Sequence, residues 1–352
     1  MEKNKSTRGI LMGFRYIGSK ARIAEDIMSY IGAPESSEGV LIDAFSGTGI
    51  IAEKAVDLGW KVKINDMMTN SIVMSEARLL CESDVPFEHF GGYASVLEVL
   101  NSLEPSEGFM WKTYSPASTK HCGIERRYFT EENAKKIDAA ASKIHEWKNS
   151  NQISEREFAL LIATLISSTN NVANIAGTYG CFLAKWTAQS MNEFKLTELP
   201  LRKETAEFSV SNIDVFDVIS DEMDTVYLDP PYTKRQYASY YHIPETLAIG
   251  DEPIVEGVAG LRPWKDKASV FCYKAKALKA LTRLIIQQKA KRVVLSYSNE
   301  GHIQLDDLAE VLSPYGEVKI VNLGSIGRYR SNKTAVENNS NVTEYLVDFR
   351  RR

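Results

Sequence analysis

Hydrophobic positions in the first part of the chain alternate between helix-like and strand-like spacing. An amphipathic helical pattern at residues 19–31 precedes a short apolar run at 40–43. A second helical pattern at 50–58 then precedes an apolar run at 61–65. A strand, a glycine-rich turn, a helix and another strand in this order form a βαβ unit, which predicts a parallel sheet with its ligand crevice at the carboxyl ends of the strands.

The middle of the chain has a different pattern, and the strand-like pattern then returns. Helical periods at residues 131–147 and 154–168 are separated by polar and aromatic stretches. Later strand-like runs lie at 208–210, 225–228 and 292–296. An amphipathic helix is predicted at 269–289, and two final apolar runs at 318–323 and 342–349 predict an antiparallel hairpin.

These patterns predict an α/β fold with a doubly wound, Rossmann-like sheet that is divided in sequence by a mostly helical insertion. We place the catalytic domain at residues 14–80 and 206–352, and the inserted domain at residues 81–205. A chain of 352 residues is long enough for one large or two ordinary domains.

Composition and charge narrow the class of protein. The chain is 44% hydrophobic and 25% charged, with a formal net charge of −4. This charge argues against a protein that coats polyanions, but a local basic face is enough for phosphate contacts. The four cysteines form no C-x-x-C pair, so neither a zinc site nor a disulfide framework is predicted. Without a signal-peptide or membrane-span pattern, we expect a cytoplasmic protein with no metal.

A glycine-rich turn, DAFSGTG at residues 43–49, lies where the first strand becomes a helix. Gly47 and Gly49 allow the backbone to approach a ligand closely, and the next helix offers free N–H groups. The third glycine of a dinucleotide fingerprint is absent, and Asp43 and Phe45 precede the glycines. The pattern suits a ligand with an amino-acid moiety and a nucleoside but no phosphate, which is S-adenosylmethionine. The alternative is a turn that only joins strand to helix.

Asp66 follows the second strand, about 20 residues after the glycine turn. A carboxylate in this place accepts hydrogen bonds from both ribose hydroxyls of a nucleoside in the crevice. The alternative is a cap for the helix that begins near Thr69.

The segment DPPY, residues 229–232, follows the strand-like run at 225–228 and carries the candidate chemistry. An exocyclic amine is a poor nucleophile, and positive charge develops on its nitrogen when it attacks a methyl group. Asp229 and the carbonyl of Pro230 can accept its two N–H groups, while Pro230 and Pro231 fix the backbone. Tyr232 offers a face on which a flat base can stack. The alternative is a rigid turn and nothing more.

A base inside a duplex cannot reach such a site. The target must be flipped out of the helix, and protein contacts must offset the cost of unstacking it. No covalent enzyme intermediate is needed, so no activated cysteine is expected.

Six segments in a fixed order carry a resemblance to a known family. They are YIGSK (16–20), DAFSGTG (43–49), the strand-end Asp66, NIDVFDVI (212–219), LDPPY (228–232) and VVLSYSNEGHI (293–303). The chain resembles the Dam-like, alpha-group N6-adenine DNA methyltransferases, which include enzymes of restriction-modification systems. The resemblance implies the methyltransferase sheet order 3-2-1-4-5-7-6 with an antiparallel seventh strand, and a target-recognition role for the insertion.

The resemblance also implies roles for single residues. Tyr16 and Lys20 would contact S-adenosylmethionine, Asp66 its ribose and Asp214 its adenine, while Asp229 would serve both the cofactor and the target amine. The full predicted cofactor set is Tyr16, Lys20, Asp43, Phe45, Gly47, Gly49, Asp66, Asp214 and Asp229. The family's usual first element, W-x-G-G-K, is changed here, because Tyr16 and Ser19 stand at two of its positions.

Two basic segments are candidates for DNA contacts. Lys234, Arg235 and Tyr237 follow DPPY directly, and similar restriction-modification enzymes carry RQY at this place. The second segment lies between the last two strands and contributes Arg328, Arg330 and Lys333. For both segments the alternative is a solvated loop.

The sequence thus predicts an enzyme that methylates N6 of a flipped adenine in a specific duplex DNA site. The resemblance further implies a bacterial or phage context and a restriction-modification system, in which a cognate endonuclease would act separately. Enzymes with related motifs methylate N4 of cytosine in DNA (often SPPY), adenine in ribosomal RNA, or glutamine in proteins (usually NPPY). Asp229, the motif order and the large insertion disfavour all three, and cytosine is the nearest rival. The alternative from another class is a sequence-specific DNA-binding relative that has lost catalysis.

Overall fold

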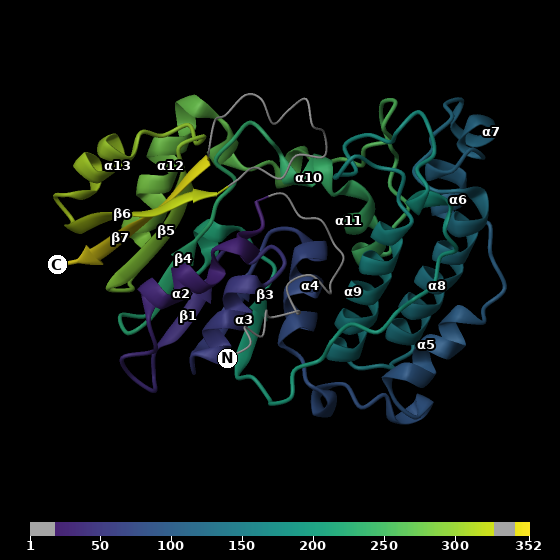
Figure 1. Ribbon diagram of the computed structural model, residues 1–352, viewed down its shortest axis with the longest axis horizontal. Helices are drawn as coiled ribbons and strands as arrows, with labels where there is room; N and C mark the ends of the chain where they lie inside the picture. Colours follow the sequence, from purple (N-terminus) through teal and green to yellow (C-terminus); the bar gives the residue numbers. More distant parts are fainter. Residues whose placement is uncertain (1–17, 327–341) are drawn as a thin grey trace, which may run out of the picture.

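A computed structural model describes residues 18–326 and 342–352, and the two remaining segments are drawn in grey in Figure 1. Four predicted contact residues lie outside the described residues: Tyr16, Arg328, Arg330 and Lys333.

Seven strands form one sheet in the order β3-β2-β1-β4-β5-β7-β6. The strands are β1 (Val40–Asp43), β2 (Lys61–Asn65), β3 (Phe208–Ser211), β4 (Thr225–Leu228), β5 (Arg292–Ser298), β6 (Gly316–Ile326) and β7 (Val342–Arg351). The first five are parallel, and β7 runs antiparallel to both β5 and β6. This confirms the α/β fold, the sheet order that the resemblance implies, and the predicted hairpin.

Helices cover both faces of the sheet, because strand residues alternate between two hydrophobic cores. On β5, Val293 and Leu295 join the core on one face and Val294 joins the core on the other. The first face is covered by α12 (Lys274–Gln287) and α13 (Leu305–Leu312), and the second by α2 (Ala24–Ile31) and α3 (Ile50–Asp57).

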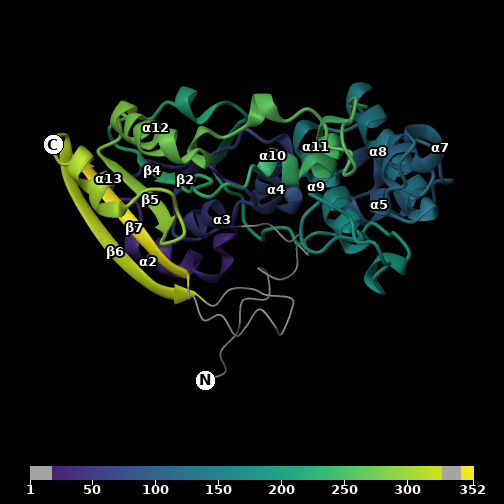
Figure 2. The same cartoon turned by 90° about the horizontal axis from the view of Figure 1, so that it is seen from above.

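A mostly helical region lies at the opposite end of the molecule from the β6–β7 hairpin (Figures 1 and 2). Its helices are α5 (Tyr93–Asn101), α6 (Phe109–Tyr114), α7 (Ser118–Cys122), α8 (Glu131–Asn149) and α9 (Glu155–Asn171). Their core also includes residues of α4 (Thr69–Leu79) and of α11 (His242–Ile249), such as Val73 and Leu247. The division at residues 81–205 therefore stays a prediction, since one core extends across both of its predicted boundaries.

The helix predicted at 269–289 begins later than expected. Residues Val270–Cys272 form a 3₁₀ turn, and α12 starts at Lys274. The physical reason is that the side chain of Gln236 satisfies the backbone of Ser269: its Oε1 accepts from the Ser269 N–H at 2.8 Å, and its Nε2 donates to the Ser269 carbonyl at 3.1 Å. Within the described ranges, no helix combines the length and apolar composition that a bilayer-spanning segment requires.

Candidate active site

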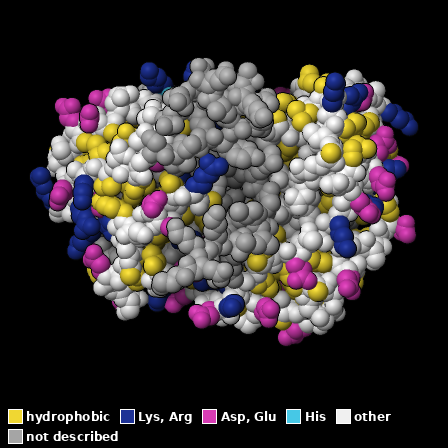
Figure 3. All heavy atoms as spheres, viewed as in Figure 1, with side chains coloured by type: hydrophobic (Ala, Val, Ile, Leu, Met, Phe, Trp, Pro, Cys, Tyr) yellow, Lys and Arg dark blue, Asp and Glu magenta, His cyan; other side chains and the backbone are white. Residues whose placement is uncertain are grey.

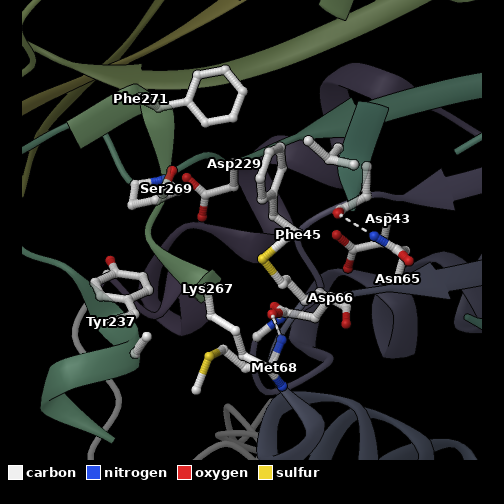
Figure 4. A pocket seen from close by; sticks show the side chains of 18 of the residues that line it. Asp43, Phe45, Asn65, Asp66, Met68, Asp229, Tyr237, Lys267, Ser269 and Phe271 are labelled. Atoms are coloured by element: carbon white, nitrogen blue, oxygen red, sulfur yellow. Dashed lines mark hydrogen bonds between the residues drawn. The ribbon is translucent and has the colours of Figure 1, made fainter. Parts of the chain in front are cut away.

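A pocket opens at the carboxyl ends of three adjacent strands, β2, β1 and β4 (Figure 4). Asp43 is the last residue of β1, Asp66 follows β2, and Asp229 follows β4. Because these strands are parallel neighbours, residues far apart in sequence meet at one edge of the sheet. The structure thus brings three of the predicted acids to one cavity.

The glycine turn is held from two sides. The Gly47 N–H donates to Asp66 Oδ2 at 3.0 Å, and the Met68 N–H donates to Asp66 Oδ1 at 2.9 Å. From α4, Ser75 Oγ donates to the Gly47 carbonyl at 3.0 Å, and Arg78 Nε donates to the Thr48 carbonyl at 2.7 Å. These bonds fix the backbone that would face a ligand.

The alternative role of Asp66 as a helix cap is not what the structure shows, because α4 begins after Met68. The first N–H groups of α4, those of Thr69 and Asn70, donate instead to the carboxylate of Glu245 at 3.1 and 2.9 Å. Glu245 lies on α11 and also accepts from Lys267 Nζ at 2.6 Å.

Replacement of Gly49 by alanine should destabilise the chain for two reasons. Gly49 has a φ of +75°, and an added Cβ would lie 2.8 Å from Ser75 Cα. Gly59→Ala is a matched control, because Gly59 has a φ of +89° and no atom of the described residues lies within 4 Å of an added Cβ. We expect Gly59→Ala to lower the free energy of unfolding by about 1 kcal/mol, and Gly49→Ala to lower it by at least about 2 kcal/mol more. Urea unfolding measures both, and equal losses would contradict the close packing of the turn on α4.

Asp43 is 1% exposed, and no side chain among the described residues donates a hydrogen bond to its carboxylate. Burial, together with the nearby carboxylates of Asp229 and Asp66, raises the pKa of Asp43 to about 8, although the backbone N–H groups of Ala52 and Phe45 oppose the rise. Burial likewise raises the pKa of Asp66 to about 6. A buried carboxylate without an ionic partner at a pocket wall would be stabilised by a cationic group of a ligand.

Lys20 lies at the centre of an ionic cluster on the other side of Asp229. Its Nζ lies 3.3 Å from Asp229 Oδ1 and 3.1 Å from Glu344 Oε2, and it donates to the Tyr232 hydroxyl at 3.3 Å. Burial lowers the pKa of Lys20, but the negative groups around it, Asp229 foremost, raise it overall to well above its ordinary value. Lys20 is therefore a fixed cation beside Asp229.

The DPPY segment is held in place by neighbouring loops. The Tyr232 ring packs on Tyr297 of β5 with centroids 4.9 Å apart, and the Tyr232 carbonyl accepts from the His302 N–H at 3.2 Å. Downstream, the Arg235 carbonyl accepts from Cys272 Sγ at 3.3 Å. The geometry of DPPY thus depends on the segments after β5 and before α12.

The structure distributes the predicted residues as follows. Those that line the pocket are Lys20, Asp43, Phe45, Gly47, Asp66, Asp214, Asp229, Pro231 and Tyr237. Gly49, Pro230 and Tyr232 lie next to lining residues but not in the pocket wall. Asp214 caps the 3₁₀ turn Val215–Asp217 through the Phe216 N–H, at 2.9 Å.

The predicted DNA-contact residues after DPPY differ in their exposure to solvent. Lys234 and Arg235 are exposed, as a phosphate contact requires. Tyr237 instead turns into the pocket (Figure 4), where burial and Asp229 raise its pKa well above its ordinary value. On the face shown in Figure 3, basic and acidic side chains are interspersed over the described residues, so phosphate contacts would be local.

Several pocket residues were missed in the sequence. Lys267, Ser269 and Phe271 come from the segment before α12 and close one side of the pocket, with the Phe271 ring edge-on to Phe45 at 5.7 Å. The only signal for them was an aromatic and basic stretch that follows no motif spacing. In the part of the chain that the structure describes, no group of three or more His, Cys, Asp or Glu side chains is arranged to hold a metal ion.

Comparison with known proteins identifies similar chains. A family model described as "D12 class N6 adenine-specific DNA methyltransferase" matches residues 16–311. The modification methylase StsI of Streptococcus sanguinis is 32% identical, with 96% of this chain and 52% of the relative covered. The type II methyltransferase M.FokI of Planomicrobium okeanokoites is 34% identical, with 86% and 47% covered. The type II methyltransferase M.NlaIII of Neisseria lactamica is 31% identical, with 94% and 97% covered. This chain thus spans about half the length of the first two relatives and nearly all of the third.

Proposed function

The chain belongs to the D12 class of N6 adenine-specific DNA methyltransferases, and from this premise we propose that it transfers a methyl group from S-adenosylmethionine to N6 of a flipped adenine in duplex DNA. The observation that carries the proposal is the position of Asp229, at the edge of the pocket that also holds Asp43 and Asp66. We further propose that the chain is the modification enzyme of a restriction-modification system in a bacterial or phage context, with a separate endonuclease and a cytoplasmic location. The names of the relatives support this assignment.

The residues of the pocket fit S-adenosylmethionine. The cofactor carries an ammonium group and a sulfonium, and the unpaired, buried carboxylate of Asp43 supplies a negative partner for a cation. The backbone around Gly47 leaves room for close approach, and Asp66 stands where ribose hydroxyls would donate to it. When bound, the cofactor supplies an electrophilic methyl group.

Asp229 makes the target amine more nucleophilic. Its carboxylate accepts one N6–H bond, and the Pro230 carbonyl accepts the other, so electron density on nitrogen becomes available as positive charge develops there. A nitrogen–carbon bond forms while the carbon–sulfur bond breaks, and N6 then loses one proton to Asp229 and from there to solvent. Lys20, 3.3 Å away, steadies the Asp229 carboxylate throughout.

Recognition of the target base requires its extrusion from the duplex. Tyr237 lines the pocket, and half-buried Tyr232 directly follows the lining residue Pro231, so both rings are available to a base that enters beside Asp229. Exposed Lys234 and Arg235 suit contacts to the phosphates around it. We assign sequence reading to the helical region at residues 81–205 as a whole.

Incubation of the purified chain with labelled S-adenosylmethionine and mixed-sequence duplex DNA tests the proposal. We expect label in DNA, and modification-sensitive long-read sequencing of DNA from cells that express the chain should place methyladenine in one short motif. Binding to DNA without any incorporation of label would support the inactive DNA-binding alternative.

The pH dependence of the reaction should show an acidic limb near pH 6. Burial raises the pKa of Asp229 to about 6, against the opposing effect of Lys20. A protonated Asp229 is a poorer acceptor, so kcat/KM should fall about tenfold for each pH unit below that value and be level just above it. Measurement from pH 5 to 8 at saturating cofactor tests this expectation. A profile that is flat down to pH 5 would show that Asp229 does not need its charge.

A further inference from the structure

A second carboxylate shares the ammonium of Lys20 with Asp229. Lys20 Nζ lies 3.1 Å from Glu344 Oε2 and 3.3 Å from Asp229 Oδ1. The side chains of Lys20, Asp229 and Glu344 are 5%, 17% and 9% exposed, so water screens them little. One cation therefore faces two anions in a largely buried place.

Glu344 reaches the cluster from β7, on which alternate side chains face the same side of the sheet. Leu346, two residues on, packs in the core with α2 and α3, and Asp348 accepts from Tyr30 of α2 at 3.0 Å. Glu344 is opposite Ser298, the last residue of β5. Of the alternate residues Glu344, Leu346 and Asp348 on this side of β7, Glu344 is thus the one nearest the pocket end of the sheet.

The effect of Glu344 on Asp229 follows from the number of carboxylates that share the Lys20 ammonium. With a single carboxylate as partner, Lys20 would pair fully with Asp229, which would lower the basicity of Asp229 and occupy its lone pairs. With two carboxylates the ammonium is divided, and the three groups carry a net charge of −1 beside an amine that becomes positive during attack. The shared ammonium leaves Asp229 more basic, and hence a stronger acceptor, than a full ion pair with Lys20 alone would.

We propose that Glu344 is a positioning residue for methyl transfer, which shares the Lys20 ammonium with Asp229 and so keeps the Asp229 carboxylate available to the target amine. The inference rests on the proposed function, since Asp229 has this task only in a methyltransferase.

The other charged or titratable side chains that face Asp229 among the described residues are kept when Glu344 is replaced. They are Lys20, Tyr227 of β4, Asp43 of β1, Tyr232 of the DPPY segment and Tyr237 of α10 (Tyr237–Tyr240). A difference in the pKa of Asp229 between the original chain and a variant at Glu344 therefore measures the effect of the Glu344 carboxylate. Its sign is set by charge: Glu344 raises the pKa of Asp229, so its removal lowers that pKa.

The test compares kcat/KM against pH for the full-length chain and Glu344→Gln. We expect the acidic limb to move to lower pH by about half to one unit, and the plateau rate to fall about tenfold because the carboxylate is a weaker acceptor. Glu344→Asp keeps the charge and should return the limb close to its original position. Glu344→Met, which also lacks the charge, gives the same comparison if the amide disturbs the fold.

Asp348→Asn is the matched control, because Asp348 is a buried acid on the same strand and the same side, paired with Arg292 at 3.2 Å and away from the pocket. It should lower the thermal unfolding midpoint without moving the acidic limb. The inference would be overturned if the acidic limb of the pH profile lay at the same pH for the original chain, Glu344→Gln and Glu344→Met. Absence of methyl transfer by the original chain would instead refute the proposed function, so the two failures are distinguishable.

Discussion

Replacement of Asp229 by alanine is expected to reduce methyl transfer by about a thousandfold or more, while folding and much of the DNA affinity are kept. The loss follows from the geometry of the site, because Asp229 is the one acid of the pocket that directly precedes the two prolines, where the target amine needs an acceptor. Single-turnover transfer of labelled methyl to DNA measures the effect on the chemical step.

Two comparisons make the Asp229 result specific. Asp266→Ala removes an exposed acid from the segment next to Lys267 and should leave the rate within about twofold. Circular dichroism and binding of S-adenosylmethionine should show that the Asp229 variant is folded and still takes up the cofactor. A variant at Asp229 that kept the original turnover would refute the mechanism.

Replacement of Asp43 by asparagine should weaken binding of S-adenosylmethionine by about tenfold to a hundredfold, and should also reduce the proton release that accompanies binding. With its pKa raised to about 8 by burial, Asp43 is mostly protonated in the free chain at pH 7. A cationic ligand favours the charged form and lowers this pKa, so binding releases a proton. Cofactor affinity should therefore rise with pH up to about 8 and level off above it.

Calorimetry at pH 7 in buffers of different ionisation enthalpy measures that proton directly. The original chain should release a substantial fraction of one proton per cofactor bound, and Asp43→Asn should release clearly less. Asp66→Asn is the matched variant, since its pKa of about 6 leaves it mostly ionised at pH 7 and its loss should weaken binding with little change in proton release. If the original chain and Asp43→Asn released equal amounts of proton, the cationic group of S-adenosylmethionine would not bind at Asp43.

The elements that local pattern determines were predicted well. The bounds of β1, β2 and β4 agree with the apolar runs at 40–43, 61–65 and 225–228, because a buried strand between turn residues has a strong local signal. The order of the strands in the sheet was predicted from the family resemblance, and the structure confirms it. The hydrophobic periodicity predicts single strands but carries no information about their order. The late start of α12 depends on Gln236, which is 33 residues away from Ser269.

The pocket was only partly predictable for the same reason. Motif residues at strand ends, such as Asp43 and Asp229, could be assigned because parallel strands bring their ends together. Glu344 is separated from Lys20 by 324 positions, so only the fold shows that the two pair. Tyr237 was predicted as a DNA-contact residue from its basic and aromatic neighbours and from the RQY resemblance; the structure places its ring in the pocket wall, and the DNA contact stays a prediction.

Mass spectrometry of nucleosides shows directly which base the chain methylates. Duplex DNA would be incubated with the purified chain and S-adenosylmethionine, digested to nucleosides and analysed for methylated bases, with the Asp229→Ala variant in parallel. We expect N6-methyladenine from the original chain and none from the variant. N4-methylcytosine in place of N6-methyladenine, or no methylated base at all, would contradict the proposed function.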